Sequence, residues 1–333
     1  MAESLTPYAL NEDFQKAEHL QKIGIIGCGT VGQEIARITS QYGMDVIFVE
    51  TGPERVAHAM RCIEEQLDEM INRWGITAGD KRVILSRIKG SSQIKDLEGC
   101  HLIIEAISTM HKGTGVGLDI RKEMFKELED IVSPETVLAS NSATILISDL
   151  SADLKYPGRV VGLSFMVSPV VGKVIEVVRG NDTTDEVYAL AARYAELIHK
   201  KPVEVMESPG NISTRMLITL INEACEIFLE GTAGIQEIDD TMKYGYGLQW
   251  GPFELADKVG LDRIVKYADH LFMEFGLFKF KASPLLKRLV RTKHLGRSTG
   301  SGFYKYDEIG REVAENLFSP EISRAGNIIN KEN

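Results

Sequence analysis

The chain has 333 residues, of which 44% are hydrophobic and 26% are charged. At about 150 residues per domain this length predicts two domains, and the composition excludes disordered, collagen-like and disulfide-stapled chains. Lys and Arg together number 38 and Asp and Glu 48, which gives a formal net charge of −10. So acidic a chain is a poor nucleic-acid binder, because phosphates need a cationic surface. A local basic patch can still hold a small anion.

The four cysteines, Cys28, Cys62, Cys100 and Cys225, include no C-x-x-C pair. We expect buried thiols in a reducing compartment, and no spacing in the sequence is typical of a metal site. Residues 1–21 are polar and mixed in charge, unlike a signal peptide. The apolar runs fall far short of a membrane span. We therefore predict a polar arm over 1–21 and a cytoplasmic protein without a membrane segment.

Apolar runs alternate with helical stripes through the first part of the chain. Strands are predicted at 22–27, 45–50, 101–107, 136–141, 159–166, 173–180 and 202–207, and helices at 31–42, 53–74, 78–88, 118–132 and 185–199. After Pro209 the strand signals end, and helices are predicted at 212–231, 235–245, 252–273 and 283–293. The sequence thus predicts an α/β domain over 22–208 and an all-helical domain over 209–333.

Three glycines, Gly27, Gly29 and Gly32, form a G-x-G-x-x-G pattern between a predicted strand and a predicted helix. The first allows a tight turn, the second lets the backbone approach a pyrophosphate, and the third lets helix and strand pack closely. Glu50, at the end of the second strand, is an acid that accepts hydrogen bonds from ribose hydroxyls and repels a 2′-phosphate. The pattern predicts a Rossmann-like site that prefers NAD to NADP. The alternative is a glycine-rich turn that binds nothing.

Further motifs resemble the 3-hydroxyacyl-CoA dehydrogenase family over roughly residues 22–307. They are IGIIGCGTVGQEIA at 23–36, IIEAI at 103–107, LASNSATI at 138–145, LSFMVSPVVGKVIEV at 163–177, GPFELADKVGLD at 251–262 and LGRSTGSGFYKY at 295–306. The resemblance implies a Rossmann-like NAD domain followed by a helical domain that pairs two chains into a homodimer. It also implies a small acyl-CoA substrate and a place in fatty acid metabolism.

The resemblance assigns cofactor contacts beyond the glycines and Glu50. These are Thr30 and Val31 in the glycine-rich turn, Ala106 and Ile107 after the fourth strand, and Asn141 after the fifth. It places two further positions, Ala143 and Thr214, at the substrate, where the family has a Ser and an Asn that hold the substrate oxygens.

The catalytic positions depart from the family pattern. The family oxidises a 3-hydroxyl with a His base that a Glu orients, and here the His position is Ser164 while the Glu is kept as Glu176. A Ser hydroxyl is no base near neutral pH, and general-base catalysis contributes about 10²–10⁴-fold. Loss of the base together with its hydrogen-bonding neighbours should therefore nearly abolish the familiar reaction.

A Gly-rich insertion at 108–117, after the fourth strand, lies where open α/β sheets bind ligands. It is either a new substrate loop, with His111 as a candidate acid or base, or a solvated surface loop. The sequence thus favours an NAD-dependent dehydrogenase with a rebuilt active site around Ser164, Glu176 and His111. Two alternatives remain open: a catalytically silent NAD-binding homologue that acts as a regulator or partner subunit, and a dehydrogenase for a different, non-CoA substrate.

Overall fold

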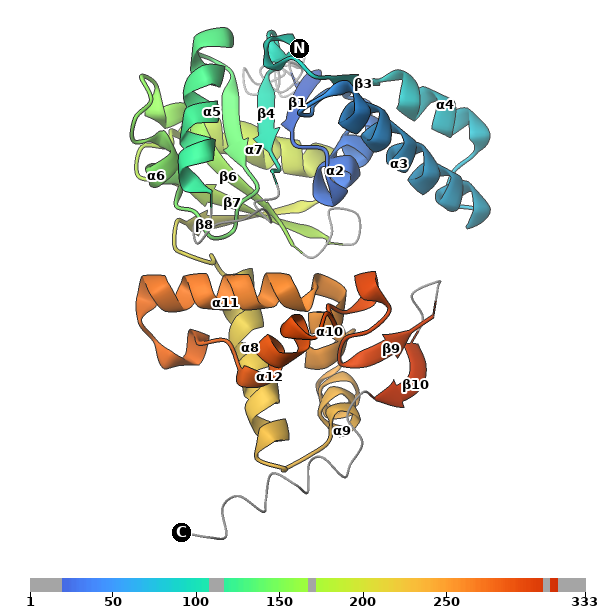
Figure 1. The fold of residues 1–333 in the computed structure, drawn as a ribbon. Helices are drawn as coiled ribbons and strands as arrows, with labels where there is room; N and C mark the ends of the chain where they lie inside the picture. The colour runs from blue at the N-terminus through green and yellow to red at the C-terminus, as the bar shows by residue number, and fades with distance from the viewer. Residues whose placement is uncertain (1–19, 108–116, 167–171, 308–311, 317–333) are drawn as a thin grey trace, which may run out of the picture. The chain divides into compact units, whose positions relative to one another are not determined.

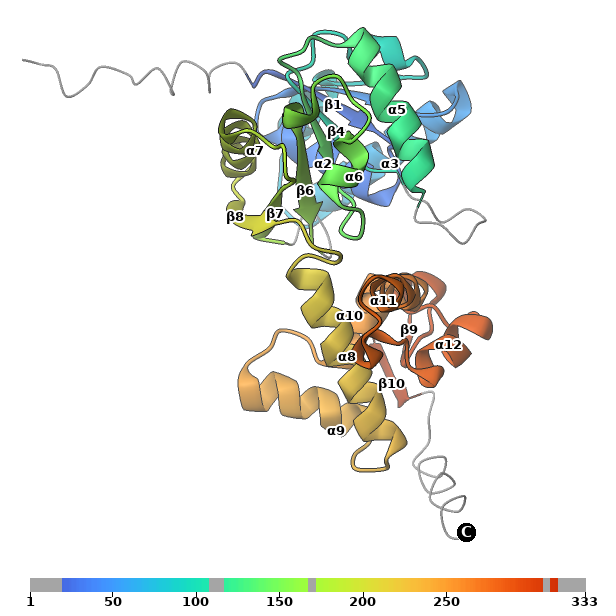
Figure 2. The same ribbon diagram turned by 90° about the vertical axis from the view of Figure 1, so that its left-hand side faces the viewer.

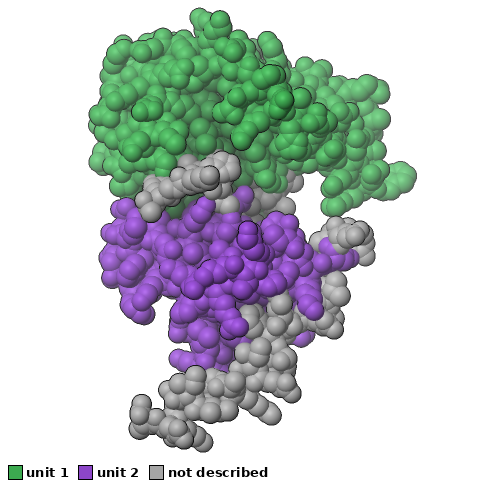
Figure 3. Space-filling model, viewed as in Figure 1, with its two compact units in different colours: residues 1–208 green, residues 209–333 purple. Residues whose placement is uncertain are grey.

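The computed structural model describes residues 20–107, 117–166, 172–307 and 312–316. The chain divides into two compact units, Met1–Ser208 and Pro209–Asn333 (Figure 3). Most of the expected polar arm, and the insertion with His111, lie outside the described residues. No helix in the described part is long and apolar enough to cross a membrane.

The first unit is built on one eight-stranded sheet (Figure 1). Its strands are β1 (Lys22–Ile26), β2 (Asp45–Val49), β3 (Ile88–Ser91), β4 (Leu102–Glu105), β5 (Val137–Ser140), β6 (Val160–Phe165), β7 (Val174–Arg179) and β8 (Lys201–Met206). Their order is β3-β2-β1-β4-β5-β6-β7-β8. The pairs from β3 to β6 are parallel, β7 runs antiparallel to β6, and β8 is parallel to β7.

Helices cover both faces of this sheet (Figures 1 and 2). They are α2 (Thr30–Gln41), α3 (Pro53–Asn72), α4 (Ala78–Ser86), α5 (Leu118–Ile131), α6 (Ile147–Ser151) and α7 (Asp185–Leu197), with short turns η2 (Ile94–Leu97) and η3 (Pro157–Arg159). Successive strand residues enter different cores: Ile25 packs with the α2, α3 and α7 side, and Ile26 with the α5 and α6 side. This alternation is the period-two pattern of a strand buried on both faces.

One strand was missed by the sequence patterns. Residues 78–88 were expected to be helical, but α4 ends at Ser86, and Ile88–Ser91 forms the edge strand β3 beside β2. The segment IKGS carries an exposed Lys89 and a glycine, so it lacks the apolar run that marks the other strands. Its hydrogen bonds to β2 define it as a strand.

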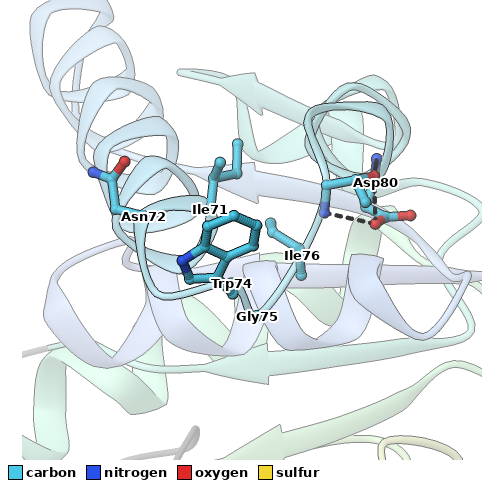
Figure 4. Close-up of a pocket in the computed structure, with 7 residues that line it drawn as sticks. Ile71, Asn72, Trp74, Gly75, Ile76 and Asp80 are labelled. Carbon is cyan, nitrogen blue, oxygen red and sulfur yellow. Dashed lines mark hydrogen bonds between the residues drawn. The ribbon is translucent and has the colours of Figure 1, made fainter.

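Helices α3 and α4 are joined by a tight turn that carries an almost fully exposed Trp74. Trp74 has a positive φ of 58°, and its ring borders a shallow hollow with Ile71 and Ile76 (Figure 4). Thr77 and Asp80 cap α4 reciprocally, with Asp80 N donating to Thr77 Oγ1 at 3.1 Å. None of the predicted site residues lines this hollow.

The second unit is helical, with a small two-stranded addition. Its elements are α8 (Ser213–Leu229), α9 (Ile235–Asp240), η4 (Thr241–Gly245), α10 (Pro252–Val259), α11 (Leu261–Phe275), η5 (Phe278–Phe280), α12 (Pro284–Arg291), η6 (Arg297–Thr299), β9 (Tyr304–Tyr306) and β10 (Glu312–Asn316). The single helix expected over 252–273 is two helices, because Gly260 takes a φ of 101° between them. The antiparallel pair of β9 and β10 was not expected.

The cysteines form no disulfide in the structure. Cys28, Cys100 and Cys225 are buried as expected, and burial raises the pKa of each thiol, to about 11 for Cys100 and about 12 for Cys225. Cys62 was expected to be buried too, but it is half-exposed, because it lies on the outward side of α3.

Candidate active site

The predicted site residues of the first unit follow one edge of the sheet. Parallel strands end at a common edge, and the strand order reverses between β1 and β4, which is where open α/β sheets bind ligands. In sheet order, this edge carries Glu50 after β2, Gly27 after β1, Ile107 after β4, Asn141 after β5 and Ser164 near the end of β6. Residues dispersed over more than a hundred positions of sequence are thus brought into one row.

The glycine-rich turn is shaped by close backbone approaches. Gly27 has a φ of 86°, and a Cβ there would lie 3.0 Å from Cα of Ile107. A Cβ on Gly32 would overlap the carbonyl oxygen of Gly27. Gly29, in contrast, has no described atom within 4 Å of its Cβ position, so open space lies in front of it within the part of the chain that the structure describes. The three glycines therefore fit the three roles expected from the sequence.

Helix α2 begins directly after this turn. Its N-cap Gly29 provides no side-chain cap, and the first turn holds no acidic residue. Gly29 and Thr30 are exposed, and Val31 is half-buried. The N-terminal N–H groups of a helix attract an anion, and this end fits the pyrophosphate of a dinucleotide.

Glu50 is held against the glycine-rich turn. Cys28 N donates to its Oε1 at 2.7 Å, and Thr51 N donates to its Oε2 at 3.2 Å. The side chain is 12% exposed, and Arg55 Nη1 lies 3.9 Å from Oε2. A carboxylate fixed beside the turn fits an acceptor for ribose hydroxyls.

A buried ion pair that the sequence patterns missed fixes the end of β4. Glu105 is 1% exposed and accepts from Ile107 N at 2.7 Å and from Ser140 Oγ at 2.6 Å. Arg121 Nε on α5 lies 3.0 Å from the Glu105 carboxylate, and its Nη2 donates to the carbonyl of Ile107 at 2.8 Å. The pair thus holds the backbone of Ala106 and Ile107, which faces the glycine-rich turn. The only sequence signal was a charged residue inside the apolar run HLIIEAI.

Asn141 links the ends of β5 and β6. Its side-chain Oδ1 accepts from the backbone N of Phe165 at 3.0 Å, and its backbone N donates to the carbonyl of Glu105 at 2.9 Å. Ala143 follows in the same loop and is half-buried. The loop before α6 therefore stays close to the end of β6.

Ser164 and Glu176 are cross-strand partners. The register of the antiparallel pair β6–β7 sets Ser164 opposite Glu176, and both are buried. Directly opposed residues in such a pair share one face, with Cβ atoms about 4.5–5.5 Å apart. The two predicted catalytic residues in the described part are therefore neighbours. His111, the third, lies outside the described residues.

Thr214 belongs to the second unit, where it is buried in the first turn of α8. Within the described residues, no three His, Cys, Asp or Glu side chains are grouped so that they would hold a metal ion.

Sequence families agree with this geometry. The model of the 3-hydroxyacyl-CoA dehydrogenase NAD binding domain matches residues 22–208, and that of the C-terminal domain of the same enzymes matches residues 210–306. The chain belongs to the 3-hydroxyacyl-CoA dehydrogenase family. It is thus an enzyme of the NAD-dependent dehydrogenase class, as the sequence motifs predicted.

Curated relatives and solved structures match over nearly their whole length. The 3-hydroxybutyryl-CoA dehydrogenase of Clostridioides difficile is 32% identical over 86% of this chain and 100% of its own. A probable 3-hydroxybutyryl-CoA dehydrogenase of Deinococcus radiodurans is 34% identical, with the same coverage of both chains. The crystal structure of (S)-3-hydroxybutyryl-CoA dehydrogenase PaaH1 from Ralstonia eutropha superposes with a TM-score of 0.78 at 33% identity, covering 87% of this chain and 100% of that one.

NAD is the cofactor of this family domain, and the residues at the sheet edge fit it. The open space at Gly29 and the N-terminus of α2 would suit a pyrophosphate, and the fixed carboxylate of Glu50 would suit a ribose. When bound, NAD supplies the hydride acceptor of a dehydrogenase.

Proposed function

We propose that the chain transfers hydride between NAD(H) and C3 of a short 3-hydroxyacyl or 3-ketoacyl group carried as a CoA thioester. The observation that carries this proposal is the Ser164–Glu176 pair at the same sheet edge as the glycine-rich turn. The names of the relatives support the substrate class.

The active site is rebuilt without a His at position 164. Oxidation of a 3-hydroxyl needs an acceptor for the hydroxyl proton as hydride leaves C3. Of the pair, the Glu176 carboxylate is the group that can accept a proton, while the Ser164 hydroxyl can donate to the substrate oxygen. Ala143 has no hydroxyl and Thr214 has no amide, so neither side chain supplies the group that the resemblance assigns to its position. We therefore expect turnover about 10²–10⁴-fold below that of a family member with the His.

A catalytically silent NAD-binding homologue, acting as a regulator or partner subunit, is the second candidate. The joint replacement at positions 143, 164 and 214 favours it, because residues that act as one unit lose their function together.

The test is an assay of NADH oxidation with acetoacetyl-CoA, alongside calorimetric titration of both ligands. Slow turnover that Glu176→Gln abolishes, with NADH binding kept, supports the proposal. Glu204→Gln on β8, 54% exposed, is the matched control. Binding of NADH without turnover of any acyl-CoA supports the silent homologue. Turnover that survives Glu176→Gln would show that another group moves the proton, and His111→Ala then tests the first candidate.

We also propose that two copies pair through the second unit. Helix α8 buries one side but leaves Ile212, just before it, and Met216 exposed, with Met216 at 68%. Further large apolar side chains of this unit are exposed at Tyr244, Tyr246, Met273 and Phe278. Ile212 and Met216 are four residues apart at the start of α8, so they lie on one side of it, and a contiguous exposed apolar patch marks an interaction surface. Light scattering at micromolar concentration tests the proposal, and a monomer would refute it.

A further inference from the structure

The Ser164–Glu176 pair faces the α5 and α6 side of the sheet. Strand residues two positions apart point to the same face, and the neighbouring pair along these strands is Gly162 opposite Val178. Val178 belongs to the core on the α5 and α6 side, and a Cβ on Gly162 would lie 3.3 Å from the Ile147 side chain, at the start of α6. The side chain of Glu176 therefore points to the face that carries the loop before α6.

The core beside the pair on this face is apolar, since Ile145, Ile147 and Val178 pack in one cluster. Glu176 is 2% exposed. It is the one ionisable group among the described residues assigned to the substrate and the reacting centre, and the others are Ala143, Ser164 and Thr214. In such surroundings a carboxylate acts strongly on the charge of a neighbouring group, because little water screens it.

Oxygen and nitrogen at C3 place opposite demands on such a site. When hydride leaves the carbon of a 3-hydroxyl, the oxygen must also lose its proton to a base. When hydride leaves a carbon that carries a neutral amine, the nitrogen keeps both protons and becomes a positively charged iminium. This step needs no base, and a neighbouring carboxylate stabilises the positive charge as it develops.

We propose that the site has a further activity, the transfer of hydride between NAD(H) and C3 of a 3-amino or 3-iminio acyl group. The carboxylate of Glu176 stabilises the nitrogen cation, and the Ser164 hydroxyl accepts a hydrogen bond from an N–H of the substrate. This activity rests on the proposed function for the hydride acceptor and for the CoA thioester. It accounts for a reacting centre with an acid at position 176 and no His at position 164.

The step balances without a further reactant. The C3–H bond breaks, and its electron pair leaves with the hydrogen as hydride, while the lone pair of the nitrogen forms the C=N bond. The substrate changes from a neutral amine to a cation with one positive charge, and the reduced nicotinamide becomes neutral. Water then adds to the iminium in a separate step, which gives the 3-ketone and an ammonium ion.

The first experiment measures binding, which does not depend on turnover. Native protein saturated with NADH is titrated calorimetrically with 3-aminobutyryl-CoA and with 3-hydroxybutyryl-CoA. Near pH 7 most of the amine is an ammonium ion, which the Glu176 carboxylate attracts. We expect the amino compound to bind about tenfold more tightly than the hydroxy compound. Glu176→Gln should remove this preference, and Glu204→Gln, at a 54% exposed acid on the neighbouring strand, should keep it.

The second experiment follows NADH formation from NAD⁺ and each of the two compounds. We expect the amino compound to be oxidised faster, and Glu176→Gln to lower its kcat about 10²–10³-fold. A substrate deuterated at C3 should react more slowly, because the C3–H bond breaks in the step. The rate should rise with pH as the ammonium ion becomes a neutral amine, well above the range in which carboxylates titrate.

Two results would overturn the inference and leave the proposed function standing. In the first, native protein oxidises the hydroxy compound and not the amino compound, a comparison that needs no variant. In the second, Glu176→Gln binds and oxidises the amino compound as well as native protein does. If NADH binds but neither compound is oxidised, the inference fails together with the proposed function, and the silent homologue is supported. Circular dichroism checks that each variant is folded.

Discussion

Ser164 and Glu176 lie directly opposite each other on the antiparallel strands β6 and β7. Both are buried at the edge of the sheet that also carries the glycine-rich turn. In the family pattern a His and a Glu occupy these positions, and the register explains how such a Glu orients such a His: the two share a face of neighbouring strands. By the resemblance, this chain carries the acid of that pair at Glu176 and a Ser in place of the imidazole.

Placing a His at position 164 tests whether the Ser164–Glu176 strand pairing can still support the family's reaction. We expect native protein to turn over 3-hydroxybutyryl-CoA negligibly compared with a family member that has the His. Ser164→His should recover little, because the groups that the family uses to hold the substrate oxygen are still missing at positions 143 and 214. The triple variant with Ala143→Ser and Thr214→Asn should recover more than the sum of the single changes, because groups that act as a unit are strongly non-additive. The measurement is kcat/KM with NADH and acetoacetyl-CoA.

Glu176→Gln in the triple variant is the control for the orienting role of the carboxylate. It should lower kcat with little change in KM, because it acts through the imidazole. Recovery by Ser164→His alone, at the level of the triple variant, would contradict the view that the three positions work together.

The glycines separate cofactor binding from folding. Gly29→Ala adds a methyl group into open space at a φ of −72°, so the melting temperature should hardly change. NADH should nevertheless bind at least about tenfold more weakly, because the backbone can no longer approach the pyrophosphate. Gly32→Ala overlaps the Gly27 carbonyl and should lower both stability and binding. Thermal unfolding and NADH titration of the two variants check this, and equal destabilisation by both would count against it.

Much of the fold was predictable because buried strands and helices leave regular spacings of apolar residues in the sequence. Every strand buried on both faces appears as an apolar run, and the glycines at 27 and 32 are required by backbone contacts that only a strand–turn–helix makes. The exceptions have physical reasons. Strand β3 lacks an apolar run. The break between α10 and α11 depends on the positive φ of Gly260, and a single glycine in a sequence does not predict such a φ.

The contacts between the site residues were harder to predict from the sequence. The pairing of Ser164 with Glu176 depends on the register of two strands joined by a loop, which no local pattern fixes. The Glu105–Arg121 pair joins residues 16 positions apart through the packing of α5 on the sheet. Tertiary contacts of this kind decide which charged residues are buried.

The Glu105–Arg121 ion pair should contribute strongly to the stability of the first unit. Arg121→Ala leaves the Glu105 carboxylate buried without its cation, which costs about 3–5 kcal/mol of unfolding free energy. The double variant Arg121→Met with Glu105→Gln should be less destabilised, because no buried charge remains. Urea unfolding checks both, and Lys122→Ala, the next residue on α5, is expected to cost less than about 1 kcal/mol. A variant Arg121→Ala as stable as native protein would refute the role.

The second unit holds a buried acid, Asp257. Its titration should make the free energy of unfolding depend on pH. It accepts from Phe303 N, Tyr304 N and Tyr306 Oη, each at 2.9 Å. Burial outweighs these hydrogen bonds and raises the pKa of Asp257 to about 6. Since its folded-state pKa lies above the unfolded value, the folded state binds the proton more tightly. Its contribution to the unfolding free energy therefore falls as pH rises from about 4 to about 6, by at most about 3 kcal/mol, and is then constant.

Tyr306→Phe isolates this contribution. It removes a donor that favours the carboxylate, so the pKa of Asp257 rises further and the decline extends above pH 6. The stability difference between native protein and the variant should grow from pH 5 to pH 7. Urea unfolding followed by tryptophan fluorescence measures it, and a Trp74→Phe background leaves Trp250 as the reporter of the second unit. Tyr244→Phe, at a residue that is 82% exposed, is the control and should show no such trend. A difference that is independent of pH would mean that Tyr306 stabilises Asp257 equally in both protonation states.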